Sequence, residues 1–433
     1  MPELRARLAL APPGVDGYVT EVLSLSIEAR ARGATVGDLY KISGRDSSVT
    51  AEVVGLRGPR VLMMPYGSVE GIRVGAAAIP LGDASGTAVG DELLGRVVDA
   101  RMNPLDRGGP FHVREHRPVH GSPLPPLDRG LVDRILPMGL RALDGLVPCG
   151  RGQRLGIFAG AGVGKSRLLG ALTETSSADV IVLALVGERG REVRDFVERV
   201  LGPKGRARSV VVVATSDRPP AERMRAALSA TAVAEYFREQ GASVLLVVDS
   251  LTRFAMAQRE VGLSVGEPPT TKGYPASVFA ALARLLERAG AARSGGSITG
   301  LYSVLVEGDD LSDPVADAAR GLLDGHIVLS RSLAGRGHYP AVDVLQSLSR
   351  LEGELLRPKD LEAARRVRTW LSKLSEAQDL LSLGAYRAGG DPVLDKALEK
   401  RAALDAFLTQ DLSIRSTLES TRADLLRVTE VSP

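Results

Sequence analysis

The chain has 433 residues, 44% of them hydrophobic and 25% charged, which is typical of a globular protein with two or three domains. A formal net charge of only +3 excludes a strong global attraction to nucleic acid or to a membrane surface. The single cysteine, Cys149, excludes an internal disulfide and suits a reducing compartment.

The amino-terminal part is predicted to be a small β-barrel. Its first residues carry no sustained apolar segment of the kind a secretory signal needs, and no run in the chain reaches the ~20 apolar residues of a membrane span. Any membrane association is therefore expected to be peripheral or through a partner. From residue 17 to about residue 80, short β-like segments (18–23, 49–54 and 61–64) alternate with Gly, Asp and Ser turns.

Residues 104–130 hold six prolines and are predicted to be an extended connector that crosses a surface. His112, His116 and His120 have the i, i+4 spacing of a helical metal site. Pro118 and the surrounding prolines argue against a helix there, so we do not expect these histidines to bind a metal.

From about residue 143 to residue 350, apolar strands alternate with helical segments. The runs 179–186, 209–214 and 243–248 are continuously hydrophobic after a first polar residue, which is typical of a parallel sheet covered on both faces. After Arg350 the strand pattern stops. Residues 361–381 and 394–425 have apolar positions three and four apart with charges between them, which predicts a helical domain.

Residues 159–166 read Ala-Gly-Ala-Gly-Val-Gly-Lys-Ser, between an expected strand at 155–158 and an expected helix from Leu168. This is the P-loop pattern with Ala159 in place of its first glycine, and an incidental Gly-rich turn is the alternative. Glycines let backbone N–H groups face phosphate oxygens, and the helix N-terminus adds partial positive charge. Lys165 is expected to reach the β- and γ-phosphates and the Ser166 hydroxyl to bind Mg²⁺. The residues expected to hold the nucleotide's phosphates are Gly160, Ala161, Gly162, Val163, Gly164, Lys165, Ser166 and Arg167.

Two strand ends supply further candidates. Asp249 ends the strand at 244–248, where a carboxylate can hold the Mg²⁺ shell through water. Glu188 follows the first strand after the P-loop helix, a place from which it can polarise the attacking water, and Arg189 can meet phosphate charge. The alternative is that Glu188 and Arg189 form a surface ion pair on a loop.

Tyr339 and Arg350 have two interpretations each. Aromatic residues make up only 4% of the chain, so Tyr339 is one of few candidates to stack on adenine, and a core position is its alternative. Nothing local places Arg350 at the phosphates of its own chain. An arginine from a neighbouring subunit often stabilises a transferring phosphoryl group, but the local sequence favours a solvated side chain.

Seven motifs, in order along nearly the whole chain, resemble those of one family. They resemble the ATPases that energise type III protein export in flagella and in virulence secretion systems, which are relatives of the subunits of rotary ATP synthases. The motifs are Ile157–Ser166, Val186–Val193, Val247–Phe254, Gly266–Pro275, Glu307–Asp317, Leu323–Arg331 and Gly337–Asp343.

The resemblance implies a multidomain α/β fold: an N-terminal β-barrel domain (1–82), a central RecA-like P-loop parallel-sheet ATPase domain (83–354, with the connector 104–130) and a C-terminal helical domain (355–433). It also implies roles for single residues. By resemblance, Lys165 contacts phosphate, Ser166 and Asp249 hold Mg²⁺, Glu188 is the catalytic glutamate, Arg189 lies near phosphate, Tyr339 packs on adenine and Arg350 is the arginine finger. Ala276 and Ala283 stand where the family often has proline, which bears on loop rigidity and not on catalysis.

The same resemblance implies ATP and Mg²⁺ as cofactors and a homohexamer at the cytoplasmic face of the inner membrane. Its implied partners are the export gate, a central stalk, a peripheral regulator and, at residues 355–433, chaperone–substrate complexes. A subunit of a rotary proton-translocating ATPase is the first alternative, although Glu188 and Arg350 in one chain favour a homohexamer. An RNA-directed ring helicase is the second. It needs an aromatic, basic platform that residues 1–80 lack, so no nucleic-acid partner is expected.

Overall fold

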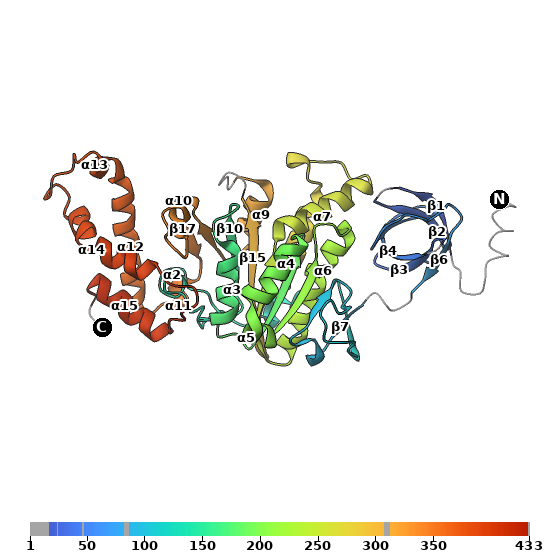
Figure 1. The fold of residues 1–433 in the computed structure, drawn as a ribbon, viewed down its shortest axis with the longest axis horizontal. Coiled ribbons are helices and arrows are strands. Elements are labelled where there is room, and N and C mark those ends of the chain that lie inside the picture. The colour runs from blue at the N-terminus through green and yellow to red at the C-terminus, as the bar shows by residue number, and fades with distance from the viewer. Residues whose placement is uncertain (1–16, 24, 46, 82–85, 307–311, 432–433) are drawn as a thin grey trace.

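The computed structural model describes residues 17–23, 25–45, 47–81, 86–306 and 312–431. The expected domain boundary at residues 82 and 83, residues 1–16 of the expected barrel domain and residues 307–311 of the acidic motif lie outside these ranges. Figure 1 shows three parts in a row, with a barrel at one end, a sheet covered by helices in the middle and a helical part at the other end. Within the described ranges, no helix is both long enough and apolar enough to cross a membrane.

The predicted β-barrel is confirmed. Its strands close in the order β1-β2-β5-β4-β3-β6, so its sheet leaves no free edge. In β4, Val49, Ala51 and Val53 are buried while the residues between them are partly exposed, which is the alternation of a sheet with one face in a core. The barrel strands are β1 (Gly17–Val22), β2 (Ile27–Ala31), β3 (Leu39–Ser43), β4 (Ser48–Arg57), β5 (Arg60–Pro65) and β6 (Ala77–Pro80).

The proline-rich connector crosses the surface of the middle part as expected, but it is not wholly irregular. It contributes β9 (Glu115–Pro118), which pairs with β7 (Gly86–Val89), and the 3-10 turn Pro126–Asp128. Arg117 forms a 2.6 Å ion pair with Glu239, and Arg129 donates a 2.6 Å hydrogen bond to the Glu287 carbonyl. His116 lies in strand β9, in agreement with the argument against a helix.

The middle part is built on a nine-stranded sheet in the described residues, ordered β17-β16-β10-β15-β13-β11-β12-β8, with β14 paired to β15. Strands β8 to β16 along this order are parallel, as predicted, whereas β17 runs antiparallel to β16. The sequence did not reveal β8, because three residues are too few to show a strand pattern. The strands are β8 (Val97–Asp99), β10 (Arg154–Ala159), β11 (Val180–Val186), β12 (Ser209–Ala214), β13 (Ser243–Asp249), β14 (Gly290–Ala292), β15 (Gly295–Leu305), β16 (Gly325–Leu329) and β17 (Val342–Ser349).

Helices cover both faces of this sheet, so successive residues of a strand enter different cores. In β11, Val182 packs with the residues of α6 to α9, and its neighbour Leu183 packs with those of α2, α3 and the helical part. The helices are α2 (Arg141–Leu146), α3 (Lys165–Thr175), α4 (Gly190–Asp195), α5 (Gly202–Ala207), α6 (Pro220–Glu239), α7 (Leu251–Ser264), α8 (Ala276–Glu287), α9 (Pro314–Leu322) and α10 (Arg331–Gly335), with the single π-helical turn Phe196–Val200, called η4, after α4 and the 3-10 turns Asp91–Leu93 and Thr271–Gly273. Ala276 and Ala283 both lie within α8, so the expectation that they bear on a loop is corrected to an unbroken helix.

The carboxyl-terminal part is helical, as predicted, and it shares a core with the middle part. Trp370 and Phe407 are buried in the same cluster as Leu172 of α3. Its helices are α11 (Glu352–Leu355), α12 (Pro358–Glu376), α13 (Gln378–Ser382), α14 (Pro392–Leu408) and α15 (Leu418–Thr429). The apolar spacing over 394–425 did not reveal the break at 409–417, which separates α14 from α15 and returns to the middle part.

Candidate active site

The P-loop lies between strand β10 and helix α3, as the sequence predicted, but α3 begins at Lys165, three residues before the expected start at Leu168. Gly162 and Gly164 have φ values of 80° and 93°, in the left-handed region that favours glycine. Val163 is buried and fixes the loop to the core, while Ala161 is exposed. Gly164 caps α3 without a side-chain hydrogen bond, so the first N–H groups of an eleven-residue helix face the loop. Such an arrangement suits phosphate oxygens.

Three charged side chains, far apart in sequence, meet beside this loop. The Lys165 Nζ donates a hydrogen bond to Asp249 Oδ1 and lies 3.7 Å from Glu188 Oε1. Asp249 is buried at the end of β13, and its Oδ1 also accepts a 2.5 Å hydrogen bond from Ser303. Because parallel strands end at one edge, β11 and β13 deliver both carboxylates to the P-loop. The sequence predicted these three residues, but not Ser303.

Burial raises the pKa of Glu188 to about 7, and the negative charge of Asp249 adds to this effect while Lys165 opposes it. A carboxyl group with such a pKa is suited to accept a proton near neutral pH. Glu188 faces Lys165, whereas Arg189 is 77% exposed and lies 3.7 Å from Glu192. The two residues therefore do not form the surface ion pair that was the alternative. The described partner of the Arg189 guanidinium is thus Glu192 and not a residue of the P-loop.

Ser166 and Asp249 are the candidates to hold Mg²⁺. Ser166 is the second residue of α3 and is exposed beside the P-loop. Its hydroxyl and the Asp249 carboxylate supply hard oxygen donors, and Mg²⁺ in nucleotide sites usually takes one or two protein oxygens together with phosphate and water. In the described ranges, no group of three or more His, Cys, Asp or Glu side chains is placed to hold a metal ion. The donor set fits a magnesium ion that arrives with a nucleotide.

Tyr339 lies against the P-loop at Gly164. A Cβ atom on Gly164 would approach the Tyr339 ring to 3.3 Å, so this ring packs directly against the loop. Beside it is a cavity of about 410 Å³. The cavity is lined by Arg167, Ala171 and Glu174 of α3, Arg199 and Val200 of η4, Tyr339, and Gln410, Asp411, Leu412 and Ser413 of the α14–α15 linker. The linker residues were not predicted, since no local pattern marks them.

Arg350 lies at the opposite edge of the sheet. Strand β17 is antiparallel, so Ser349 pairs with Gly325 at the start of β16, and the Arg350 N–H bonds the Asp324 carbonyl at 3.0 Å. The Asp324 N–H in turn donates a hydrogen bond to the carbonyl of Arg154, the first residue of β10. The P-loop follows the last residue of that strand. These ends are roughly 16 Å apart along the strand. The guanidinium is exposed and donates to the Arg320 carbonyl at 3.1 Å.

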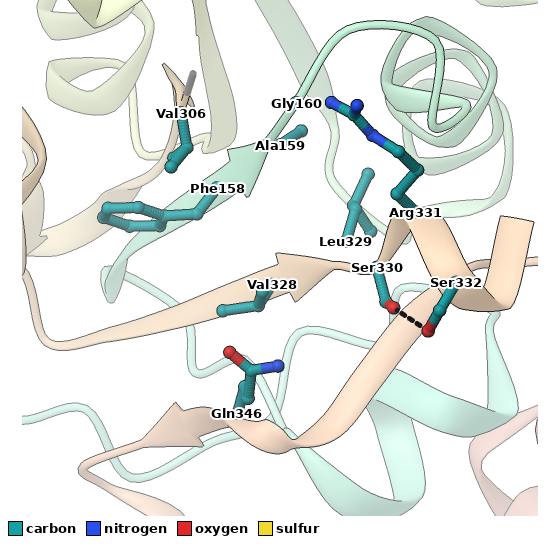
Figure 2. A pocket seen from close by; sticks show the side chains of 10 residues that line it. All are labelled: Phe158, Ala159, Gly160, Val306, Val328, Leu329, Ser330, Arg331, Ser332 and Gln346. Carbon is teal, nitrogen blue, oxygen red and sulfur yellow. Dashed lines mark hydrogen bonds between the residues drawn. The ribbon is translucent and has the colours of Figure 1, made fainter. Parts of the chain in front are cut away.

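Two arginines near the P-loop were not predicted. Arg253 of α7 packs against Gly187, and its buried Nε has no hydrogen-bond partner among the described residues. Arg331 lines a second cavity, of about 250 Å³, at the ends of β10, β15 and β16. Figure 2 shows its side chain extending from the start of α10 toward the P-loop. Both could meet anionic charge.

The chain matches three family models in succession. Residues 19–82 match the β-barrel domain of the ATP synthase alpha/beta family, and residues 139–349 match its nucleotide-binding domain. Residues 356–427 match the T3SS EscN ATPase C-terminal domain.

Similar proteins agree with these matches. The flagellum-specific ATP synthase of Pseudomonas aeruginosa is 47% identical over 96% of this chain and 93% of its own length. The type 3 secretion system ATPase of Sinorhizobium fredii is also 47% identical, over 96% and 92%. Among solved structures, the assembled ATPase EscN of the enteropathogenic E. coli type III secretion system has a TM-score of 0.91 and 43% identity, covering 95% of this chain and all of that chain.

EscN in complex with its central stalk EscO has a TM-score of 0.88 and 42% identity over the same shares. The carboxyl-terminal match and these names support the export-ATPase expectation over a subunit of a rotary proton-translocating ATPase. The chain is an ATPase that belongs to the ATP synthase alpha/beta family and, within it, to the flagellum-specific and type III secretion ATPases.

Proposed function

We propose that the chain forms a homohexameric ring that hydrolyses MgATP at each subunit boundary and energises protein export through a flagellar or virulence type III apparatus. The observation that supports a ring is that Arg350 lies at the amino ends of the sheet strands, whereas the P-loop of the same chain lies at their carboxyl ends. One chain thus offers a phosphate-binding edge and, on another edge, an exposed arginine. A second copy brings the two together.

In the proposed mechanism, the P-loop amides and Lys165 bind the phosphates. Phosphate oxygens draw Lys165 away from Asp249, and this frees the carboxylate. When bound, Mg²⁺ neutralises phosphate charge, with Ser166 and Asp249 as the residues that hold it. Glu188 orients a water and accepts its proton as the water attacks the γ-phosphorus. The bond from the γ-phosphorus to the β-phosphate oxygen breaks, and ADP leaves with that oxygen. Arg350 of the neighbouring copy stabilises the developing negative charge, and the exposed Arg189 adds to this stabilisation once two copies have met.

The partners follow from the relatives. EscN has been solved with a central stalk, and we propose a comparable stalk for this ring. An export gate, a peripheral regulator and chaperone–substrate complexes complete the proposed set, the last binding at residues 355–433. Through them the ring associates with the cytoplasmic face of the inner membrane, releases chaperones and unfolds cargo. No nucleic acid takes part.

Mixed rings test the proposal. Lys165→Ala and Arg350→Ala should each abolish hydrolysis, while a mixture should recover part of it, because some boundaries pair an intact P-loop with an intact arginine. Phosphate release is measured across mixing ratios, with co-assembly checked by differently tagged chains. Co-assembled rings that show no recovery would contradict an arginine that acts in trans.

A further inference from the structure

The wall of the cavity of about 410 Å³ beside Tyr339 comes from two distant parts of the chain. Tyr339 supplies an aromatic face beside the P-loop, and residues 410–413, between α14 and α15, supply the opposite side. Through this linker the helical domain lines the cavity together with α3 and Tyr339. Its shape is fixed by Asp411, whose Oδ1 accepts hydrogen bonds from the N–H and the hydroxyl of Ser413 at 2.9 and 2.8 Å.

Gln410 joins this linker to Tyr339 directly. Its backbone N–H donates a 2.9 Å hydrogen bond to the Tyr339 carbonyl. One residue earlier, the Thr409 hydroxyl lies 3.4 Å from His338 Nδ1. The segment that carries the aromatic ring is therefore tied at two successive residues to the start of the linker.

The Gln410 side chain is buried and is bonded at both ends. Its Oε1 accepts from the Arg141 N–H at 2.9 Å, and its Nε2 donates to the carbonyls of Gly139 and Ile414 at 2.9 and 2.6 Å. An amide is the side chain that can accept and donate in this way at one site. Removing it leaves buried backbone groups without partners, which the linker can satisfy only by moving.

The anchor on which Gln410 rests belongs to the nucleotide domain. Asp144 accepts hydrogen bonds at 2.8 Å from the N–H groups of both Met138 and Gly139. Thr175, the last residue of α3, donates to the Met138 carbonyl. The helix that begins at the P-loop thus ends on the same short segment that holds Gln410. A continuous set of hydrogen bonds runs from α3 through Gln410 to Tyr339.

We propose that Gln410 is a positioning residue that fixes Tyr339 against the P-loop and thereby sets how much the base adds to nucleotide affinity. The inference rests on the proposed packing of adenine on Tyr339. It has a consequence for regulation, because any displacement of the helical domain that moves the α14–α15 linker also moves Tyr339. A partner bound to the helical domain then changes affinity for the base and leaves phosphate binding unchanged.

Binding of ATP and of inorganic tripolyphosphate, measured by calorimetry on the full chain, separates these contributions. For Gln410→Ala we expect ATP affinity to fall roughly tenfold, the range of a lost base–aromatic stack, with tripolyphosphate affinity unchanged. Tyr339→Ala should do the same. The double variant should be no weaker than Tyr339→Ala alone, since residues that act through one another are not additive.

Arg368→Gln is the matched control, because Arg368 also ties the helical domain to the nucleotide domain, through the Leu146 carbonyl, but has no described contact with Tyr339. It should leave the ratio of the two affinities unchanged. If Gln410→Ala does not fold, Gln410→Glu keeps the size and one acceptor but loses both donated bonds, and it should lower ATP affinity selectively.

The inference on Gln410 would be overturned if Tyr339→Ala lowers ATP affinity selectively but the Gln410 variants leave the ratio of ATP affinity to tripolyphosphate affinity unchanged, including by an equal loss of both. If the wild-type chain binds both ligands equally, or if Tyr339→Ala has no effect, the proposed placement of the base fails instead.

Discussion

The charged side chains at the carboxyl ends of the parallel strands (the carboxyl edge of the sheet) differ in environment from those at the amino ends (the amino edge). At the carboxyl ends of the strands, Lys165, Glu188 and Asp249 are partly or fully buried, and their charges partly neutralise one another beside the P-loop. At the amino edge, Arg154 is fixed by Asp324 through two 3.0 Å hydrogen bonds, but the nearby Arg350 is exposed. Lys165 must leave its carboxylate partners before it can bind an anion, whereas the exposed Arg350 guanidinium can meet an anion without such a rearrangement. The carboxyl edge is thus suited to bind an anion within the chain, and the amino edge leaves Arg350 accessible to a second copy.

Lys165→Ala should have the largest effect, because the lysine contacts phosphate when nucleotide is bound and pairs with Asp249 and Glu188 when it is absent. We expect ATP hydrolysis to fall by on the order of 10³-fold through lost charge stabilisation. Stability without nucleotide should also fall, by about 3 kcal/mol, because the buried Asp249 and the partly buried Glu188 lose their cation. Phosphate release and chemical denaturation measure the two losses.

The double variant Lys165→Ala/Asp249→Asn separates them, since it should regain stability but not activity. Lys204→Ala, an exposed lysine on α5, is the control. Full stability in the single variant would contradict the mutual neutralisation described here.

Arg350→Ala should lower kcat by on the order of 10³-fold, the contribution of an arginine supplied in trans. Because its side chain is exposed and donates one described hydrogen bond, thermal stability and ATP affinity of the dilute chain should remain near wild type. Arg134→Ala, at a side chain 79% exposed, is the control. Weakened ATP binding by the isolated Arg350→Ala chain would place the arginine in its own site and remove the contrast between the edges.

The pH dependence of kcat/KM reports the carboxyl edge of the free enzyme. The raised pKa of Glu188, about 7, means that the group is mostly protonated below neutral pH and cannot accept a proton there. Activity should rise with pH through 7 and reach a plateau near pH 8. Glu188→Gln should remove this rise and lower the rate by about 10²- to 10⁴-fold. A wild-type profile that is flat between pH 6 and 8 would exclude Glu188 as the base.

The sequence predicted the carboxyl edge well because its signals are local: a Gly-rich loop between strand and helix, and carboxylates that end apolar strands. It did not predict the position of Arg350, because the direction of β17 depends on its pairing with β16 and not on its own residues. Gln410 and Ser303 were missed for a similar reason. Each meets its partners across a long stretch of chain, as in the contact of Gln410 with Arg141, 269 residues apart. Local pattern shows which groups a site contains, while tertiary approach decides which of them touch.

Arg189→Ala should have the smallest effect on the isolated chain and is informative for that reason. Its side chain is 77% exposed and its described partner is Glu192, so stability should change by no more than about 0.5 kcal/mol. ATP affinity of the dilute chain should not change, because the exposed guanidinium contacts Glu192 and no residue of its own P-loop among the described residues. A loss of kcat that is seen only at concentrations where the ring assembles would place Arg189 with Arg350, among the cations that act after two copies meet. A loss in the dilute chain would instead assign it to the carboxyl edge, beside Glu188.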